Sequence, residues 1–126
     1  MKSFFATAVK CYEEDGVSIV ALGDDLTDPA NFIIITRLDD EDNITLDDGV
    51  GFQTEQAEYE MPNAIKKVIL RAESLEIVVK PEFVEFFGDS SFLAEIPQDG
   101  KRPESASMLK DALQEIFRGT KVDLIV

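Results

Sequence analysis

Carboxylates are the side chains through which this chain is best equipped to do chemistry. The sequence holds 26 Asp and Glu residues, 12 Lys and Arg residues and no histidine. Fifteen of the acids fall between Glu13 and Glu60, where Arg37 is the only base, and the remainder holds 11 acids and 11 bases. The whole net charge of −14 therefore lies in one stretch. Clustered carboxylates can bind metal ions, form an acid–base pair or attract a basic partner.

The densest run of acids offers the hard oxygen ligands that Ca²⁺ prefers. Registered from Asp39, ligand positions one, three and five of a calcium-binding loop fall on Asp39, Glu41 and Asn43. The sixth position is Ile44 where such a loop needs glycine, and the twelfth is Val50 where it needs a bidentate glutamate. We therefore predict no metal site and no cofactor. A small metal-assisted hydrolase that uses this loop stays as an alternative.

The sequence lacks the residues that other common catalytic and cofactor-binding arrangements need. Without histidine, the chain has no Ser-His or Cys-His pair. The single cysteine, Cys11, occupies an apolar-facing strand position, which predicts a buried structural thiol. The glycines at 49 and 51 lack the rest of a dinucleotide-binding fingerprint, and the absence of Trp disfavours a sugar cleft. We predict that the protein is not an enzyme.

The charge asymmetry favours a binding role. Solubility charges normally carry both signs, whereas this stretch carries one base among fifteen acids. A purely solubilising role stays open. Such a surface attracts basic proteins and disfavours nucleic acids and anionic membranes. The predicted partner-binding carboxylates lie in loops around a central strand and after the next one: Asp24, Asp25, Asp28, Asp39, Asp40, Glu41, Asp42, Asp47, Asp48, Glu55, Glu58 and Glu60.

Length and composition predict one domain over residues 1–126. With 44% apolar residues the chain can bury a real core, and no segment approaches the roughly 20 apolar residues that span a bilayer. The apolar run at the start ends too soon for a signal peptide, and one cysteine cannot form an internal disulfide. We expect a cytoplasmic protein.

Period-two alternation predicts most of the elements that must position these carboxylates. Strands are expected over residues 4–12, 17–22, 31–37, 49–55, 64–71, 74–80, 91–96 and 122–126. The first and second form a hairpin, as do the fifth and sixth. In the first strand Phe5, Val9 and Cys11 share a face, and the strand over 31–37 is apolar on both faces, as if covered on both sides.

Two helices complete the expected fold. Pro81 suits the first turn of a short helix that ends before Gly88. Apolar residues at three- and four-residue spacing predict the main helix, with Ser105 as its cap and Arg118-Gly119 as a cation and stop at its end. We predict an α+β fold, a mainly antiparallel sheet of six to eight strands with the C-terminal helix packed on one face.

The order of these segments resembles the immunity protein 10 family. The resemblance covers about residues 30–120, departs from the family at Tyr59–Asn63, and rests on Phe32–Arg37 with the acids after it, Gly49–Gln53, the hairpin Ala64–Val79 and Leu109–Gly119. The family belongs to bacterial polymorphic-toxin and contact-dependent growth inhibition systems. The resemblance implies a small cytoplasmic antitoxin that binds the toxin domain delivered by a neighbouring cell, and it carries over no binding residue.

Charge and resemblance lead to one hypothesis. The chain is expected to be an immunity protein that occludes the active site of a basic toxin, a ribonuclease or deoxyribonuclease, with carboxylates in the places of substrate phosphates. The oligomeric state is left open. Besides the metal-assisted hydrolase, a structural or adaptor subunit stays as an alternative, one that dimerises through exposed faces of Val78 and Ile125.

Overall fold

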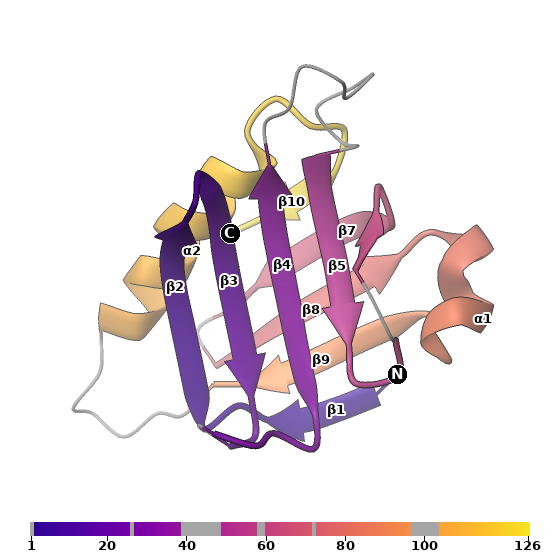
Figure 1. Ribbon diagram of the computed structural model, residues 1–126, viewed down its shortest axis with the longest axis horizontal. Helices are drawn as coiled ribbons and strands as arrows, with labels where there is room; N and C mark the ends of the chain where they lie inside the picture. The colour runs from indigo at the N-terminus through magenta and orange to yellow at the C-terminus, as the bar shows by residue number, and fades with distance from the viewer. Residues whose placement is uncertain (1, 26, 39–48, 58–59, 72, 97–103) are drawn as a thin grey trace.

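Two sheets and a C-terminal helix build the molecule, which confirms the α+β class (Figure 1). The computed structural model describes residues 2–25, 27–38, 49–57, 60–71, 73–96 and 104–126, and only the backbone of residues 104–106. Within these ranges ten strands form two sheets of five, where the sequence pattern suggested one sheet. The sheets pack face to face, with strands that cross at a steep angle in Figure 1.

Sheet B carries the acidic stretch and is antiparallel throughout. In spatial order it contains β2 (Ala8–Glu14), β3 (Val17–Gly23), β4 (Phe32–Leu38), β5 (Val50–Thr54) and β6 (Met61–Pro62). The predicted hairpin of β2 and β3 is confirmed. It turns at Asp15 and Gly16, whose φ angles of 52° and 80° are both positive, as a tight two-residue hairpin turn requires.

Sheet A contains, in spatial order, β1 (Lys2–Phe5), β9 (Ser91–Glu95), β8 (Ser74–Val79), β7 (Ile65–Leu70) and β10 (Asp123–Ile125). The predicted hairpin of β7 and β8 is confirmed. The two edge strands pair in parallel, β1 with β9 and β10 with β7. These pairings join the two ends of the chain to its middle, and alternation within one strand gives no signal for them.

The first predicted strand is two strands in different sheets. The chain leaves sheet A at Ala6, whose amide donates to the Glu95 carbonyl at 2.8 Å, and enters sheet B at Ala8. The expectation that Phe5, Val9 and Cys11 share a face is therefore wrong. Phe5 lies on the outside of sheet A, 65% exposed, while the other two pack against the core from sheet B.

The core lies between the sheets and is completed by α2 (Glu104–Phe117), which lies behind β2 and β3 in Figure 1. The buried side of α2 carries Leu109, Leu113, Ile116 and Phe117. Opposite the helix, three phenylalanine rings form a cluster: the ring centroid of Phe52 lies 5.0 Å from that of Phe87 and 5.7 Å from that of Phe92. Such tilted and edge-on contacts stabilise aromatic cores beyond simple burial.

The ends of the helices follow local signals. The short predicted helix is confirmed as a 3₁₀ turn, η2 (Pro81–Phe83), followed by α1 (Val84–Phe87) and stopped by Gly88 at φ 79°. Helix α2 stops before Gly119, also at φ 79°. It begins at Glu104, so Ser105 lies in its first turn and not before it. No helix within the described residues is long and apolar enough to cross a membrane.

Strand β4 is packed on one face only. Ile33, Ile35 and Arg37 point into the core and are buried. On the other face Phe32 and Ile34 are half-buried, Thr36 is buried and Leu38 is exposed. In the part of the chain that the structure describes, no helix or strand lies over that second face (Figure 1). For the described residues the expectation of a strand covered on both faces is therefore wrong: β3 and β5 flank β4 within the sheet, and no second layer lies over this face.

Candidate functional site

The single base of the acidic stretch is turned inward. Arg37 is buried on the core side of β4. Its Nη1 atom donates to the carbonyl oxygens of Glu115 at 3.2 Å, Ile116 at 2.8 Å and Arg118 at 2.7 Å. These carbonyls end α2, where the helix leaves acceptors without intrahelical partners and favours positive charge. The guanidinium of Arg37 therefore stabilises the end of α2, and its positive charge does not lie on the outer surface of sheet B.

The uncovered side of sheet B is apolar at its centre, and we call it the outer face. Residues that are paired across β2, β3 and β4 form rows on this face, each row with one residue from each strand. From one end to the other the rows are Ala8, Gly23 and Phe32; Lys10, Ala21 and Ile34; Tyr12, Ile19 and Thr36; Glu14, Val17 and Leu38. Tyr12 is 47% exposed and Leu38 is 46% exposed. An apolar sheet face with large exposed side chains is a feature of interaction surfaces.

Acids stand at the end of the outer face where β2 turns into β3. Glu13, Glu14 and Asp15 are exposed there, and Glu14 shares a register row with Leu38, after which the densest acidic run begins. The predicted carboxylates of that run, Asp39, Asp40, Glu41, Asp42, Asp47 and Asp48, lie outside the described residues, as does Glu58. Residues 13–15 were not among the predicted site residues. Their sequence signal was the turn at Asp15-Gly16, but only the strand register shows that they stand beside the end of β4.

The loop between β3 and β4 stands at the opposite end, and Asp24 organises it. Its Oδ1 accepts from the Ala30 amide at 2.9 Å, and its Oδ2 accepts from the Asn31 amide at 3.2 Å and from Asn31 Nδ2 at 2.9 Å. The side-chain hydrogen bond from Asn31 is the main reason that the pKa of Asp24 is lowered. Thr7 Oγ1 also donates to the Asp24 carbonyl at 2.8 Å. Asp24 therefore holds the loop in shape.

Two predicted carboxylates of the same loop face solvent. Asp25 and Asp28 are exposed, and the Asp28 amide donates to Asp25 Oδ2 at 3.2 Å. Strand β4 leads away from them to Leu38, which shares a row with Glu14, so the described acids at 13–15 and those at 25 and 28 stand at opposite ends of the outer face. A partner that contacts both must span the length of the strands.

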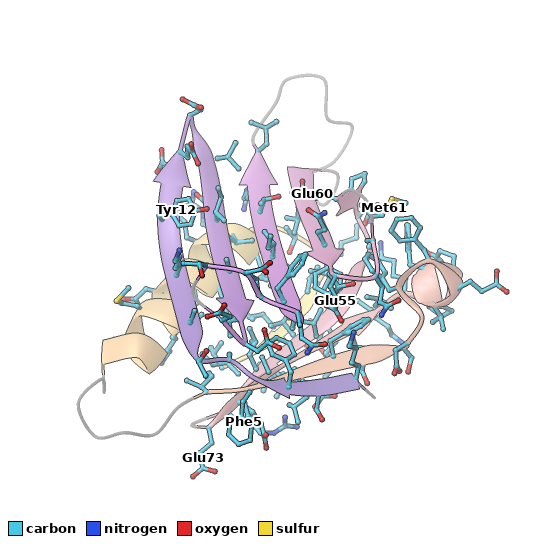
Figure 2. The ribbon with its side chains drawn as sticks, turned by 60° about the horizontal axis from the view of Figure 1, so that its bottom comes forward. Phe5, Tyr12, Glu55, Glu60, Met61 and Glu73 are labelled. Carbon is cyan, nitrogen blue, oxygen red and sulfur yellow. The ribbon has the colours of Figure 1, made fainter. Side chains whose placement is uncertain are left out.

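Glu55 and Glu60 differ in what they contact. The Glu55 carboxylate is paired with the Lys2 ammonium of sheet A and accepts from the Phe32 amide at 3.2 Å, so it joins the two sheets. Glu60 is exposed beside Met61, near the β6 edge in Figure 2. Its carboxylate lies so near Gly51 of β5 that a Cβ atom there would overlap it. Glu60 therefore borders the outer face, and Glu55 belongs to the interior junction.

A scan against protein-family models and a search of curated proteins both found no match for this chain. The resemblance to the immunity protein 10 family stays a prediction.

Two findings bear on metal and thiol chemistry in the described part of the chain. No three His, Cys, Asp or Glu side chains there are grouped to hold a metal ion. The calcium-like register from Asp39 lies outside the described residues. Cys11 is half-buried on the core side of β2, and burial raises the pKa of its thiol, which disfavours the nucleophilic thiolate. The geometry that the described residues do assemble is an apolar face between two groups of acids.

Proposed function

We propose that this protein is a cytoplasmic immunity protein that binds and blocks a basic toxin domain through the outer face of sheet B. The observation that carries the proposal is the division of charge across β4. Its outer face lies between exposed acids, while Arg37, the only base from Glu13 to Glu60, is bonded to the end of α2 on the inner side. A basic surface approaching the outer face therefore meets carboxylates without that competing cation.

The composition of the face suits protein recognition. Protein interfaces typically combine an apolar centre with a polar rim, and aromatic side chains are enriched at the centre. Here Tyr12 and Leu38 supply exposed apolar surface beside the half-buried Ile19, and Glu14, Asp25 and Glu60 stand around it. The lopsided field raises association rates by roughly 10 to 1000-fold at low salt. The apolar centre would then set the lifetime of the complex.

Occlusion of a nuclease is the mechanism that this chemistry favours. The active site of a ribonuclease or deoxyribonuclease presents Lys and Arg to phosphates, and carboxylates can occupy the same positions. Close charge pairs across an interface couple by roughly 1.5 to 7 kcal/mol. Such inhibition needs no catalytic residue and no cofactor on the inhibitor.

The test needs the partner that the proposal expects, a small basic domain at the end of a large secreted protein, which is to be sought in the gene immediately upstream of the one that encodes this chain. This expected partner is called the basic domain. Association is measured by stopped flow at rising salt, and inhibition is measured with an RNA or DNA substrate. In one variant Asp39, Asp40, Asp42, Asp47 and Asp48 are changed to Asn. A matched control changes Glu82 and Glu85, exposed acids of η2 and α1, to Gln.

The proposal expects slower association for the Asn variant, an unchanged rate for the control and salt-dependent rates for both. It also expects Tyr12→Ala to dissociate faster, because Tyr12 lies on the apolar centre. On-rates that neither salt nor the Asn variant changes would contradict the acidic-surface mechanism. Absence of inhibition by the unmodified protein would contradict the immunity role itself.

A second candidate function, a structural or adaptor subunit, is favoured by the other sheet. On the outer side of sheet A, Phe5 is 65% exposed, Ile125 is 44% exposed and Val78 is half-buried (Figure 2 shows Phe5 pointing away from the molecule). Sedimentation of the purified chain discriminates the two. A stable dimer that Phe5→Ser dissociates, together with no inhibition of the basic domain, would favour the adaptor.

A further inference from the structure

A shallow hollow of about 190 Å³ opens on the outer face, at the end near the β3–β4 loop. Strand register explains it. Ala8 and Gly23 stand in one row with Phe32, and Ala21 stands in the next row with Ile34. Small side chains on β2 and β3 thus form a floor beside two large side chains on β4.

The loop closes the hollow on its remaining side. Pro29 packs so near Gly23 that a Cβ atom there would lie 3.1 Å from Pro29 Cβ. The loop itself is held by the hydrogen bonds that Asp24 accepts from Ala30 and Asn31. The Phe32 amide is also bonded to Glu55. The walls of the hollow are therefore built before any partner arrives, which lowers the cost of binding.

Charges of opposite sign line two sides of the hollow. Asp25 belongs to the lining, with Asp28 three residues further along the same loop, and Lys10 contributes from β2. A cation that enters beside Asp25 is attracted, and a cation that enters over β2 is repelled by Lys10. Asp25 and Lys10 together therefore favour one orientation of a bound basic segment, with its positive charge beside Asp25 and away from Lys10.

We infer that this hollow receives one bulky apolar side chain of the basic partner, flanked by an arginine or lysine that meets Asp25. The inference rests on the proposed function and names the anchor of that same interface. A single well-packed side chain at the centre of an interface commonly carries much of its affinity. The hollow gives such a side chain a place on the described outer face where it can lie below the surface.

The first experiment tests the hollow without the partner. Amide chemical shifts of the ¹⁵N-labelled protein are followed during titration with phenylalanine amide, a cation with an aromatic ring. N-acetylphenylalanine supplies the ring with a negative charge, and lysine amide supplies the positive charge without a ring. With phenylalanine amide we expect the amide shifts of Ala21, Gly23 and Ile34 to change and to saturate, with a dissociation constant on the order of tens of millimolar. The other two compounds should cause smaller changes. Ala21→Met, which fills the hollow, should remove the changes caused by phenylalanine amide.

Three outcomes would overturn the inference. Shifts from phenylalanine amide no larger than those from lysine amide would show that the hollow does not select an apolar ring. Larger shifts from N-acetylphenylalanine would contradict the preference for a cation. Shifts that persist in Ala21→Met would place the ring elsewhere. Ala21→Ser, which keeps the side chain small, is the matched control and should bind phenylalanine amide as the unmodified protein does.

The second experiment uses the basic domain and separates the inference from the proposed function. Ala21→Met should weaken the complex about 30-fold through faster dissociation, with the on-rate and the unfolding midpoint unchanged. If Ala21→Met binds with the affinity of the unmodified protein, while the Asn variant of the acidic run still associates more slowly, the anchor in the hollow is contradicted and the immunity role is not. No binding by the unmodified protein would instead remove the proposed function.

Discussion

The Arg37 guanidinium donates to the carbonyl oxygen of Ile116 at 2.8 Å, across 79 positions of the sequence. The bond joins the central strand of sheet B to the last turn of α2. Because the carbonyls of Glu115 and Arg118 accept from the same nitrogen, one buried cation satisfies three acceptors at the negative end of the helix. The residue that looked like an interruption of the acidic surface is a structural link beneath it.

Replacement of Arg37 should cost considerable stability. Arg37→Met keeps the volume of the stem but leaves buried carbonyls without a donor, so we expect the free energy of unfolding to fall by about 2–3 kcal/mol. Urea unfolding followed by circular dichroism measures it. Arg118→Met is the matched control, because Arg118 is exposed and pairs with Glu115 at 3.5 Å on the helix surface, and it should cost less than about 0.5 kcal/mol. Equal losses in the two variants would contradict a capping role for Arg37.

Local signals predicted the parts of the fold that depend on neighbours in sequence. Asp15-Gly16 needs positive φ at two successive residues, and Pro81 and Gly88 bracket the short helical segment of η2 and α1, so each leaves a readable mark. The division into two sheets leaves none. It depends on the step at Ala6 between β1 and β2 and on parallel pairing of both chain ends with the middle of the chain. Such long-range choices are decided by packing and not by the pattern of any one strand.

The candidate site likewise has features that the sequence predicts and features that only the fold shows. The sequence showed where the acids are, and exposure at Asp25, Asp28 and Glu60 agrees with a surface role. It could not show that Glu55 is paired with Lys2, because that partner comes from another sheet. Nor could it show the hollow beside Phe32, which depends on the register of β2, β3 and β4.

The hydrogen bonds of Asp24 predict a pH dependence of stability. Its pKa in the folded protein is lowered from the ordinary value of 3.8, chiefly by the hydrogen bond from the side chain of Asn31. The ionised form is therefore favoured by folding, and its contribution is present above about pH 4 and is lost as the pH falls through the lowered pKa. Asp24→Asn should be less stable than the unmodified protein at pH 7, and the difference should shrink toward pH 2.5. Urea unfolding at both pH values measures it.

The control for this prediction is Asp28→Asn, which removes the same charge from the same loop. Asp28 contributes its backbone amide to the loop, in the bond to Asp25. Its replacement leaves the hydrogen bonds of Asp24 in place, so at pH 7 it should cost less stability than Asp24→Asn. The same change in pH dependence for both variants would assign the effect to loop charge and not to the bonds of Asp24.

The close approach of Glu60 to Gly51 predicts a coupling between the two positions. A Cβ atom at position 51 overlaps the Glu60 carboxylate, so Gly51→Ala must push that exposed side chain aside. In the unmodified background we expect a change in stability of less than about 1 kcal/mol in either direction, because a flexible surface side chain yields easily. With Glu60→Ala already present, Gly51→Ala should stabilise by about 0.5–1 kcal/mol, since alanine loses less backbone entropy than glycine on folding. A double-mutant cycle in urea measures the coupling, and additive effects would contradict the contact.

Lys10 supplies the sharpest test of where a basic partner binds, because its replacement should improve binding. Lys10 is an exposed cation on the outer face, in the row of Ala21 and Ile34, and it opposes a basic surface that approaches that face. Lys10→Glu should raise the on-rate for the basic domain about 3- to 10-fold at low ionic strength, with the gain fading in high salt. Lys66→Glu makes the same change of charge at an exposed residue of β7, in the other sheet, and should raise the rate much less. Equal gains would mean that net charge alone steers the encounter, and a loss in Lys10→Glu would place the partner's base-rich surface somewhere other than the outer face.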